Sequence, residues 1–301
     1  MQHRRLLALT LTLALTGAAA ADQAGHAGTY IWREDDPNFG GFSGIEVIEG
    51  GTRFYALTDR AHLFWGEILR DDTGAIAGLS SEGHSNLRGI RGVPLPAGQR
   101  GDSEGLAIAK DGSIWVSFEG DHRVARYPSP DAPPAEVRRP PVPPYMGRNA
   151  GYEALALDAE GRPVIVPERS ASRDAPFPVH VLDEGAWRSL GTIPRSGRWL
   201  PVGADFGPDG RFYLLERDFL GPLGFASRVR SMTLHEDGAR DEITLMQSRP
   251  LQYDNLEGIS VWSDGDQIRM TMISDDNFLF LQRTEVVEYI LTSDGRHARR
   301  N

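Results

Sequence analysis

Acidic side chains recur at matched positions along the 301-residue chain. A glutamate opens three segments of similar pattern, at Glu104, Glu153 and Glu257. The acids that close these segments are Glu119, Glu168, Asp275 and Asp276. Carboxylate oxygens without histidine or cysteine ligands suit a hard cation such as Ca²⁺ or Mg²⁺. We therefore predict a divalent-cation site, with Ca²⁺ favoured over Mg²⁺.

The closing acids also suggest how such a site would act on a substrate. A cation that polarises an ester or phosphoryl oxygen needs a general base beside it. Glu119 or Glu168 is predicted to be that base. The predicted cation ligands come from Glu104, Glu153, Glu257, Asp275 and Asp276.

Three arginines, Arg60, Arg169 and Arg217, each directly follow an acid at the end of such a segment. A guanidinium group binds a carboxylate or a phosphate through two parallel hydrogen bonds. We predict that these arginines bind a small anionic ligand. The alternative is that each one pairs with a neighbouring acid of the protein itself.

The acids belong to a degenerate repeat. Its clearest copies are EGLAIAKDGSIWVSFE (104–119), EALALDAEGRPVIVPE (153–168) and VGADFGPDGRFYLLER (202–217), with further copies at 43–60 and 257–272. In all five, a glycine lies eight positions after the first residue, with alternating apolar residues on both sides. This pattern is typical of a β-hairpin whose turn fixes the register. The copies begin 61, 49, 49 and 55 residues apart, which is the spacing of four-stranded propeller blades.

The fold predicted from this repeat is an all-β β-propeller that forms a single domain over residues 22–301. Five blades are visible in the repeat and six are favoured. Strands at Thr29–Arg33 and Glu285–Leu291 would complete a closing blade, since closure removes exposed strand edges. The alternative is an all-β sandwich with unrelated turns of similar sequence.

The turn positions predict which acids face each other. They place Glu104 opposite Glu119 and Glu153 opposite Glu168, at the hairpin ends remote from the turns. If the first strand of each hairpin is innermost, these carboxylates crowd one mouth of the central channel. Facing like charges destabilise a strand pair, so a cation, an arginine or a substrate must compensate them. The alternative is that the acids are solvated at strand ends.

Composition excludes several other classes of protein. The net charge of −10 argues against a nucleic-acid partner, which requires a basic surface. The chain has no cysteine, and its eight histidines show no zinc-binding spacing. The segment Gly41–Gly44 lacks the spacing of a serine-nucleophile elbow.

The first 21 residues have the pattern of a signal peptide. His3, Arg4 and Arg5 precede an apolar run over residues 6–16, and Ala18–Ala21 supplies small residues for cleavage. No later window is apolar enough to span a bilayer. We predict a periplasmic or secreted protein without a membrane anchor in its mature form.

Eight short segments, in order along the chain, resemble the phytase-like propeller family that is named for an "esterase-like activity of phytase". They are FGGFSGIE (39–46), FYALTDR (54–60), DSEGLAI (102–108), NAGYEALAL (149–157), PERS (167–170), LLERDF (214–219), DNLEGIS (254–260) and SDDNF (274–278). This resemblance implies an exported propeller that hydrolyses ester or phosphoester bonds.

The first strand of the repeat is also similar to gluconolactonase-type propellers. In that family a glutamate, an asparagine and an aspartate hold one divalent metal at the channel mouth. That similarity gives Asn149, Asn255 and Asn277 a ligand-binding role. The combined expectation is a metal-assisted hydrolase; the alternatives are a non-catalytic ligand- or partner-binding propeller and a lactonase-like enzyme or lyase acting on sugar acids.

Overall fold

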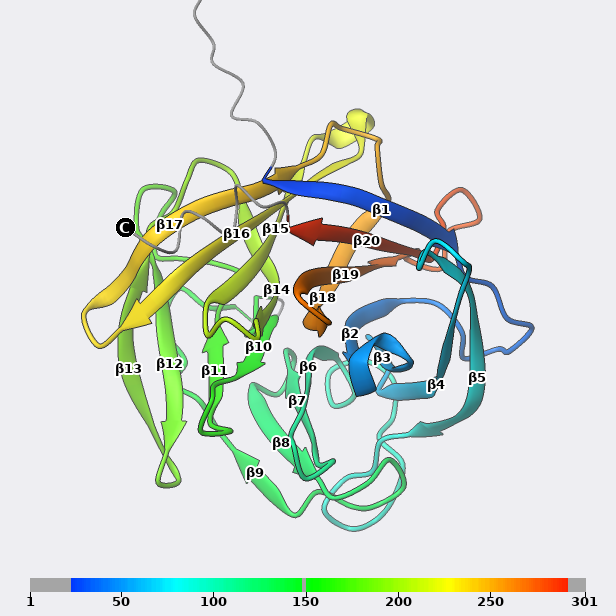
Figure 1. Ribbon diagram of the computed structural model, residues 1–301. Helices are drawn as coiled ribbons and strands as arrows, with labels where there is room; N and C mark the ends of the chain where they lie inside the picture. Colours follow the sequence, from blue (N-terminus) through cyan, green and yellow to red (C-terminus); the bar gives the residue numbers. More distant parts are fainter. Residues whose placement is uncertain (1–22, 148–149, 292–301) are drawn as a thin grey trace, which may run out of the picture.

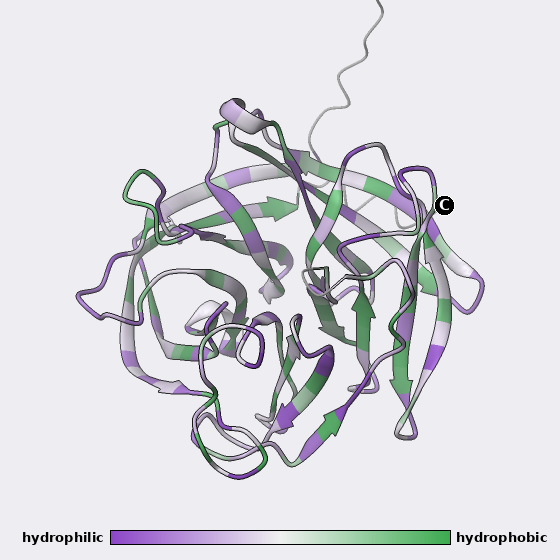
Figure 2. Ribbon diagram, turned by 180° about the vertical axis from the view of Figure 1, so that it is seen from behind, coloured by the Kyte–Doolittle hydropathy of each residue, from purple (hydrophilic) through white to green (hydrophobic). Residues whose placement is uncertain are grey.

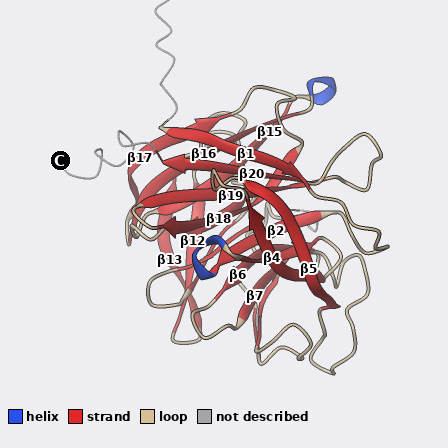
Figure 3. Cartoon of the chain, turned by 45° about the vertical axis from the view of Figure 1, so that its right-hand side comes forward, coloured by secondary structure: helices blue, strands red, loops and turns tan. Residues whose placement is uncertain are grey.

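The computed structural model describes residues 23–147 and 150–291. These residues form five four-stranded antiparallel sheets, arranged as blades around a central axis (Figure 1). Two short 3-10 helices, η1 (Glu49–Gly51) and η2 (Gly221–Leu223), are the helical elements of the described chain (Figure 3). Neither helix has the length and apolar character needed to cross a membrane. The all-β propeller predicted from the repeat is therefore confirmed.

The four strands of each blade follow one another from the central axis to the outer edge. Blade 1 contains β2 (Phe42–Ile48), β3 (Arg53–Thr58), β4 (His62–Arg70) and β5 (Ile76–Asn86). Blade 2 contains β6 (Ser103–Ile108), β7 (Ile114–Phe118), β8 (Arg123–Tyr127) and β9 (Glu136–Arg138). Blade 3 contains β10 (Ala154–Leu157), β11 (Pro163–Val166), β12 (Phe177–Asp183) and β13 (Ala186–Ile193). Blade 4 contains β14 (Leu200–Phe206), β15 (Phe212–Phe219), β16 (Phe225–His235) and β17 (Gly238–Gln247). The closing blade contains β18 (Asn255–Asp264), β19 (Gln267–Asp275), β20 (Glu285–Leu291) and β1 (Ala24–Ile31).

The closing blade joins the two ends of the described chain. Strand β1 pairs with β20 along its length, from Ala24 opposite Leu291 to Ile31 opposite Glu285. In Figure 1 the blue β1 covers the red β20 at the outer edge of this blade. The favoured count of six blades is wrong, because the fifth hairpin (β18–β19) supplies only two strands. The N-terminal and C-terminal strands complete that blade and do not form another one.

Apolar residues of adjacent blades pack against each other and form the core. Between blade 4 and the closing blade, for example, Leu215 and Val229 share a buried cluster with Met270 and Met272. Hydrophobic and hydrophilic positions alternate along the outer strands, as Figure 2 shows. This alternation follows from the two-residue period of a strand, which places successive side chains on opposite sheet faces.

A β-bulge interrupts four of the five inner strands at the same place in the repeat. In each of these blades the first residue of the repeat has no partner in the regular pairing. This residue is Ser43 in blade 1, Val202 in blade 4 and Glu257 in the closing blade. In blade 2 both Glu104 and Gly105 are left out of the pairing. A bulge adds residues on one strand only and so shifts the register beyond it. The predicted pairing of Glu104 with Glu119 is therefore wrong. The Glu119 N–H donates to the Asp102 carbonyl at 2.8 Å instead.

The predicted pairing of Glu153 with Glu168 is wrong in the same sense. Strand β10 begins at Ala154, which lies opposite Val166, and the Glu168 N–H donates to the Gly151 carbonyl at 3.0 Å. The backbone of each closing acid therefore pairs with a residue two positions before the glutamate that the sequence predicts as its partner.

Small residues follow the bulges and close the centre of the propeller. A Cβ on Gly258 would lie 2.7 Å from the Ile45 nitrogen, and one on Gly105 would lie 2.7 Å from the Glu153 carbonyl oxygen. The inner strands therefore approach so closely that the space between them, along this ring, is only about 10 Å³. The channel is closed at mid-height, and each of its two mouths is a separate cavity.

Candidate functional site

One mouth of the propeller is a cavity of about 270 Å³ lined mostly by acids. Its carboxylates come from the inner hairpins of blades 1, 2 and 3 and of the closing blade. They are Asp59, Asp102, Glu104, Glu119, Glu153, Glu168, Glu257 and Asp275. Arg169, Arg217 and Asn277 complete the lining. We call this the acidic cavity. It contains eight carboxyl groups and two guanidinium groups, so it carries a large excess of potential negative charge.

Arg217 of β15 neutralises part of that charge. Its guanidinium contacts Glu257 of the closing blade, and it lies 3.3 Å from a Glu168 oxygen and 3.9 Å from a Glu153 oxygen of blade 3. Asn255 joins this network, since its Oδ1 accepts from Arg217 at 3.3 Å and its Nδ2 donates to Glu257 at 2.7 Å. Burial acts to lower the pKa of Arg217, but the three carboxylates outweigh it and raise the pKa. Arg217 is therefore a fixed cation of the site.

A second group of carboxylates lies on blade 2, away from Arg217. Asp102, Glu104 and Glu119 each offer an oxygen within 4.8 Å of the others. Glu119 also accepts a hydrogen bond from the Gly151 N–H at 3.0 Å. Among residues 23–147 and 150–291, no ion pair joins these three acids to an arginine. We call them the blade 2 triad.

Burial, with the charges of neighbouring acids, raises the pKa values of several acids of the cavity. Burial, followed by the charges of Glu153 and Glu257, raises the pKa of Glu104 well above its ordinary value. Burial raises the pKa of Glu119 to about 7, and burial together with the Glu257 charge raises that of Asp275 to about 8. Burial raises the pKa of Asp59 to about 6, against the opposing effect of Arg60. Proton uptake is the response of a carboxylate cluster that lacks enough cations.

The predicted cation ligands divide into four groups. Glu104 belongs to the blade 2 triad, whereas Glu153 and Glu257 contact Arg217. Asp275 lines the acidic cavity and accepts from the Asn277 N–H at 2.6 Å. Asp276 does not line the cavity. Its carboxylate accepts from the backbone N–H groups of Gly41 and Phe278, at 2.9 and 3.0 Å, and so holds the adjacent loops together.

The two predicted base candidates lie in different parts of the acidic cavity, and only two of the three predicted ligand-binding arginines line it. Glu119 lies in the triad, and Glu168 lies between Arg217 and Arg169, 3.0 Å from the latter. Arg169 lines the cavity with about half of its side chain exposed. Arg60 does not line it; its guanidinium stacks on the Phe278 ring, 3.3 Å from the ring centre.

Two of the three predicted asparagines are near the acidic cavity. Asn277 lines the cavity, and Asn255 accepts a hydrogen bond from Arg217, which lines it. Asn149 lies outside the described residues.

Two acids of the cavity, Asp102 and Asp59, were not predicted as site residues. Asp102 lies two positions before Glu104, where a regular strand would carry both side chains on one face. Their oxygens do converge despite the bulge beside Glu104, and the acidic pattern D-x-E was the sign of this in the sequence. One side-chain oxygen of Asp59, Oδ1, is buried and has no hydrogen-bond partner among the described residues.

The family comparison matches residues 37–278 to the Phytase-like model, described as "Esterase-like activity of phytase". The chain belongs to the Phytase-like family. The matched region begins before blade 1 and ends directly after Asp275, so it contains all eight carboxylates of the acidic cavity. No curated protein matches the sequence.

Several solved structures are similar to this chain at low sequence identity. The α-L-arabinofuranosidase of Podospora anserina, solved with cellotriose, is 13% identical, with a TM-score of 0.51 over 89% of this chain and 96% of that one. A gluconolactonase from Xanthomonas campestris is 13% identical, with a TM-score of 0.42 over 82% and 72% of the two chains. A luciferin-regenerating enzyme is 10% identical, with a TM-score of 0.41 over 84% and 93%. At such identities the arabinofuranosidase supports the propeller fold alone.

Proposed function

We propose that this Phytase-like protein is an exported, divalent-cation-assisted hydrolase of ester or phosphoester bonds, with its site in the acidic cavity. The observation that carries the proposal is the blade 2 triad, whose oxygens converge within 4.8 Å without an arginine partner among the described residues. Three converging carboxylates can be stabilised by protons or by a cation, and the hard oxygen donors that they offer suit Ca²⁺. The triad would hold the cation.

The donor set fits a hard cation in a second respect. Arg217 occupies the other half of the cavity and pairs with Glu153 and Glu257, so these two acids already share a cation of the protein itself. This division replaces the sequence-based ligand set, in which Glu104, Glu153 and Glu257 act together. Glu119 becomes a ligand candidate, which leaves Glu168 as the candidate base.

The remaining side chains suggest how hydrolysis would proceed. When bound, the cation would polarise the carbonyl or phosphoryl oxygen of the substrate. Glu168 would accept a proton from the attacking water, whose oxygen forms the new bond to carbon or phosphorus. The bond to the leaving oxygen then breaks, and Asp275, whose pKa is raised to about 8, would donate the proton to that oxygen. Arg169 at the cavity lining would bind an anionic part of the substrate.

Export rests on the N-terminal sequence. The basic residues, the apolar run over 6–16 and Ala18–Ala21 match a cleaved signal. Expression of the full chain with a C-terminal tag, followed by cell fractionation and N-terminal sequencing, tests this. Periplasmic or secreted protein that begins at residue 22 is expected; full-length protein in the cytoplasm would contradict it.

Activity is tested with protein first treated with a chelator and then dialysed. We expect turnover of p-nitrophenyl butyrate, p-nitrophenyl phosphate, bis(p-nitrophenyl) phosphate or a sugar lactone when Ca²⁺ is added, and none in the chelator. Glu104→Gln should reduce kcat/KM at least 100-fold. The control Glu82→Gln changes an exposed glutamate on β5 that pairs with Arg53, and it should leave kcat/KM unchanged.

Two other results would overturn the proposal in different ways. Stoichiometric Ca²⁺ binding without turnover of any of these substrates would make the protein a binding propeller. Turnover that persists in the chelator and in Glu104→Gln would remove the cation and the triad from the reaction.

A further inference from the structure

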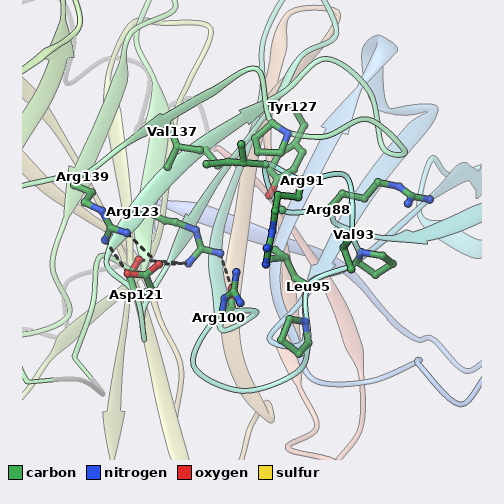
Figure 4. Close-up of a pocket in the computed structure, with 16 residues that line it drawn as sticks. Arg88, Arg91, Val93, Leu95, Arg100, Asp121, Arg123, Tyr127, Val137 and Arg139 are labelled. Atoms are coloured by element: carbon green, nitrogen blue, oxygen red, sulfur yellow. Dashed lines mark hydrogen bonds and ion pairs between the residues drawn. The ribbon is translucent and has the colours of Figure 1, made fainter.

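A second cavity, of about 670 Å³, lies on blade 2 beside the segment that connects β5 to β6. Figure 4 shows its side chains. Five arginines line it: Arg88, Arg91, Arg100, Arg123 and Arg139. The one acid in the lining is Asp121. We call it the arginine pocket. Its charge is opposite to that of the acidic cavity, and it is unusual in a chain whose net charge is −10.

Asp121 compensates only a small part of this positive charge. Arg139 makes two hydrogen bonds to its carboxylate, at 2.7 and 3.2 Å, and Arg123 lies 3.6 Å from it. Arg88 donates to the Gly92 carbonyl at 2.9 Å and has no carboxylate partner within residues 23–147 and 150–291. For Arg91 and Arg100, the described part of the chain provides no ion pair at all. Five guanidinium groups therefore share one carboxylate.

Arg123 is a buried cation of the arginine pocket. Its side chain is 9% exposed, lies over the Phe118 ring at 3.7 Å, and donates to the Arg100 carbonyl at 2.5 Å. Burial lowers the pKa of Arg123, and the charges of Arg139 and Arg100 lower it further. The protein thus holds a buried cation among other cations, an arrangement that a bound anion would stabilise.

The rest of the lining is apolar. Leu95, Tyr127 and Val137 form walls, with three prolines nearby. At the opening, Ile90 and Val93 are 74% and 62% exposed. A ligand that fills this pocket must therefore combine an anionic group with an apolar part. The ligand cannot be the duplex or single strand of a nucleic acid, because the basic residues are confined to one pocket in an acidic protein.

We propose that the arginine pocket binds a phosphate monoester that carries an apolar or aromatic group. A phosphate dianion has three terminal oxygens, so several guanidinium forks can bind it at once. It also neutralises more of the excess charge than a carboxylate does. The pocket is separate from the acidic cavity, and binding there does not depend on the proposed hydrolysis.

Titration calorimetry with phenyl phosphate as the probe tests this directly, in the presence of a chelator so that no hydrolysis interferes. We expect one saturable site that binds phenyl phosphate at least ten-fold more tightly than inorganic phosphate or benzoate, and no heat from phenol. Arg91→Gln and Arg100→Gln should each weaken binding at least ten-fold. Neither residue has a partner in an ion pair, so these variants should fold normally.

Three further variants separate the pocket from other effects. Arg240→Gln changes an exposed arginine that pairs with Asp237 on blade 4, and it should leave the affinity unchanged. Asp121→Asn should strengthen binding, because it removes the anion that competes with phosphate; a purely structural role would not produce this gain. Glu104→Gln should have no effect on phenyl phosphate affinity, whatever it does to hydrolysis.

Absence of saturable phenyl phosphate binding would overturn the proposal. Binding that is equally weakened by Arg240→Gln would overturn it as well, since the effect would then be one of net charge. A higher affinity for benzoate than for phenyl phosphate would also reject the phosphate monoester as ligand.

Discussion

Arg217 of blade 4 contacts Glu257 of the adjacent closing blade at the mouth of the propeller. The same guanidinium reaches Glu168 and Glu153 of blade 3, so one side chain connects three consecutive blades. The protein therefore contains its own cation for one half of the acidic cavity. The blade 2 triad in the other half has no equivalent arginine among the described residues. This asymmetry places the proposed cation site on blade 2.

Loss of the Arg217 charge should destabilise the protein when no divalent cation is present. Arg217→Gln leaves three partly buried carboxylates without their partner, and removal of one member of a buried pair costs about 3 kcal/mol or more. We expect the free energy of unfolding in urea, measured in chelator, to fall by about that amount. Added Ca²⁺ should restore more stability to the variant than it gives to the wild type, because the acids are then free to bind it.

Arg198→Gln is the matched control for this experiment. Arg198 pairs with Asp218 on the same blade, but 58% of its side chain is exposed. A surface pair contributes about 1 kcal/mol or less, so the control should change little. Equal losses in the two variants would show that Arg217 has no special role in the cavity.

The close contact of the inner strands predicts a second stability effect. In Gly258→Ala, the new Cβ would lie 2.7 Å from the Ile45 nitrogen and 2.8 Å from Gly44 atoms, all of them backbone. Because backbone cannot rotate away, β18 and β2 must separate, at a cost of about 1–3 kcal/mol. Urea denaturation should show this loss, whereas Gly25→Ala on β1, which has open space around it, should not. Equal stability of the two variants would contradict the close contact.

The sequence predicted the propeller and the convergence of its acids from one feature, the glycine at a fixed place in each hairpin. The turn at Asp111–Gly112 determines the pairing of β6 with β7, and the other hairpins follow the same rule. It did not determine the blade count, since β1 and β20 pair across the whole length of the chain. The pairing of the two terminal strands was predicted from the need to close exposed strand edges and is confirmed, but no local signal showed that they complete the blade of the fifth hairpin.

The site itself was less predictable, for a physical reason. A one-residue change of register reverses the side of a strand that a residue faces, and in four of the five blades a bulge makes such a change beside the leading residue. Glu216 shows the consequence. Its position in the repeat suggests a rim acid, but it is fully buried beside Arg228 and Arg230, while the adjacent Arg217 faces the cavity. The arginine pocket has no sequence signal either, because its residues come from separate loops and strands.

Glu216 is expected to be one of the most important acids for stability. Its carboxylate accepts from Arg228 Nε at 2.9 Å and from Arg230 Nε at 2.8 Å, inside blade 4. Glu216→Gln leaves two buried guanidinium groups short of negative charge, and this should cost about 3–5 kcal/mol in the free energy of unfolding. Glu236→Gln, at an exposed position of the same blade, should change it by less than about 0.5 kcal/mol. A small effect at Glu216 would mean that Glu242, which also pairs with Arg230, compensates for it.

The opposite mouth of the propeller predicts a pH effect on stability. A cavity of about 600 Å³ there is lined in part by Glu46 and Asp205, both on inner strands. Glu46 accepts a hydrogen bond from Ser260 Oγ at 3.1 Å, and Asp205 accepts from the Val261 N–H at 2.6 Å. Burial, and then the Asp205 charge, raises the pKa of Glu46 well above its ordinary value, while burial raises the pKa of Asp205 to about 7.

Because these pKa values are raised in the folded state, the folded protein binds protons more tightly than the unfolded chain. The resulting stability is complete below about pH 4, the ordinary pKa of an acid, and is lost as the pH rises through about 7. In Glu46→Gln the side chain keeps an oxygen for Ser260 and cannot ionise. We therefore expect the variant to gain stability relative to the wild type between pH 5 and pH 8, by about 1.4 kcal/mol for each pKa unit of the shift it removes.

Urea denaturation at pH 5, 6, 7 and 8 measures this difference, with Glu67→Gln on the exposed side of β4 as the control. The acidic cavity also contains carboxyl groups with raised pKa values, so the wild type and the control should both lose stability over this range. Only the difference between Glu46→Gln and the wild type reports on the opposite mouth. If that difference is the same at all four pH values, Glu46 does not change its ionisation in the folded protein.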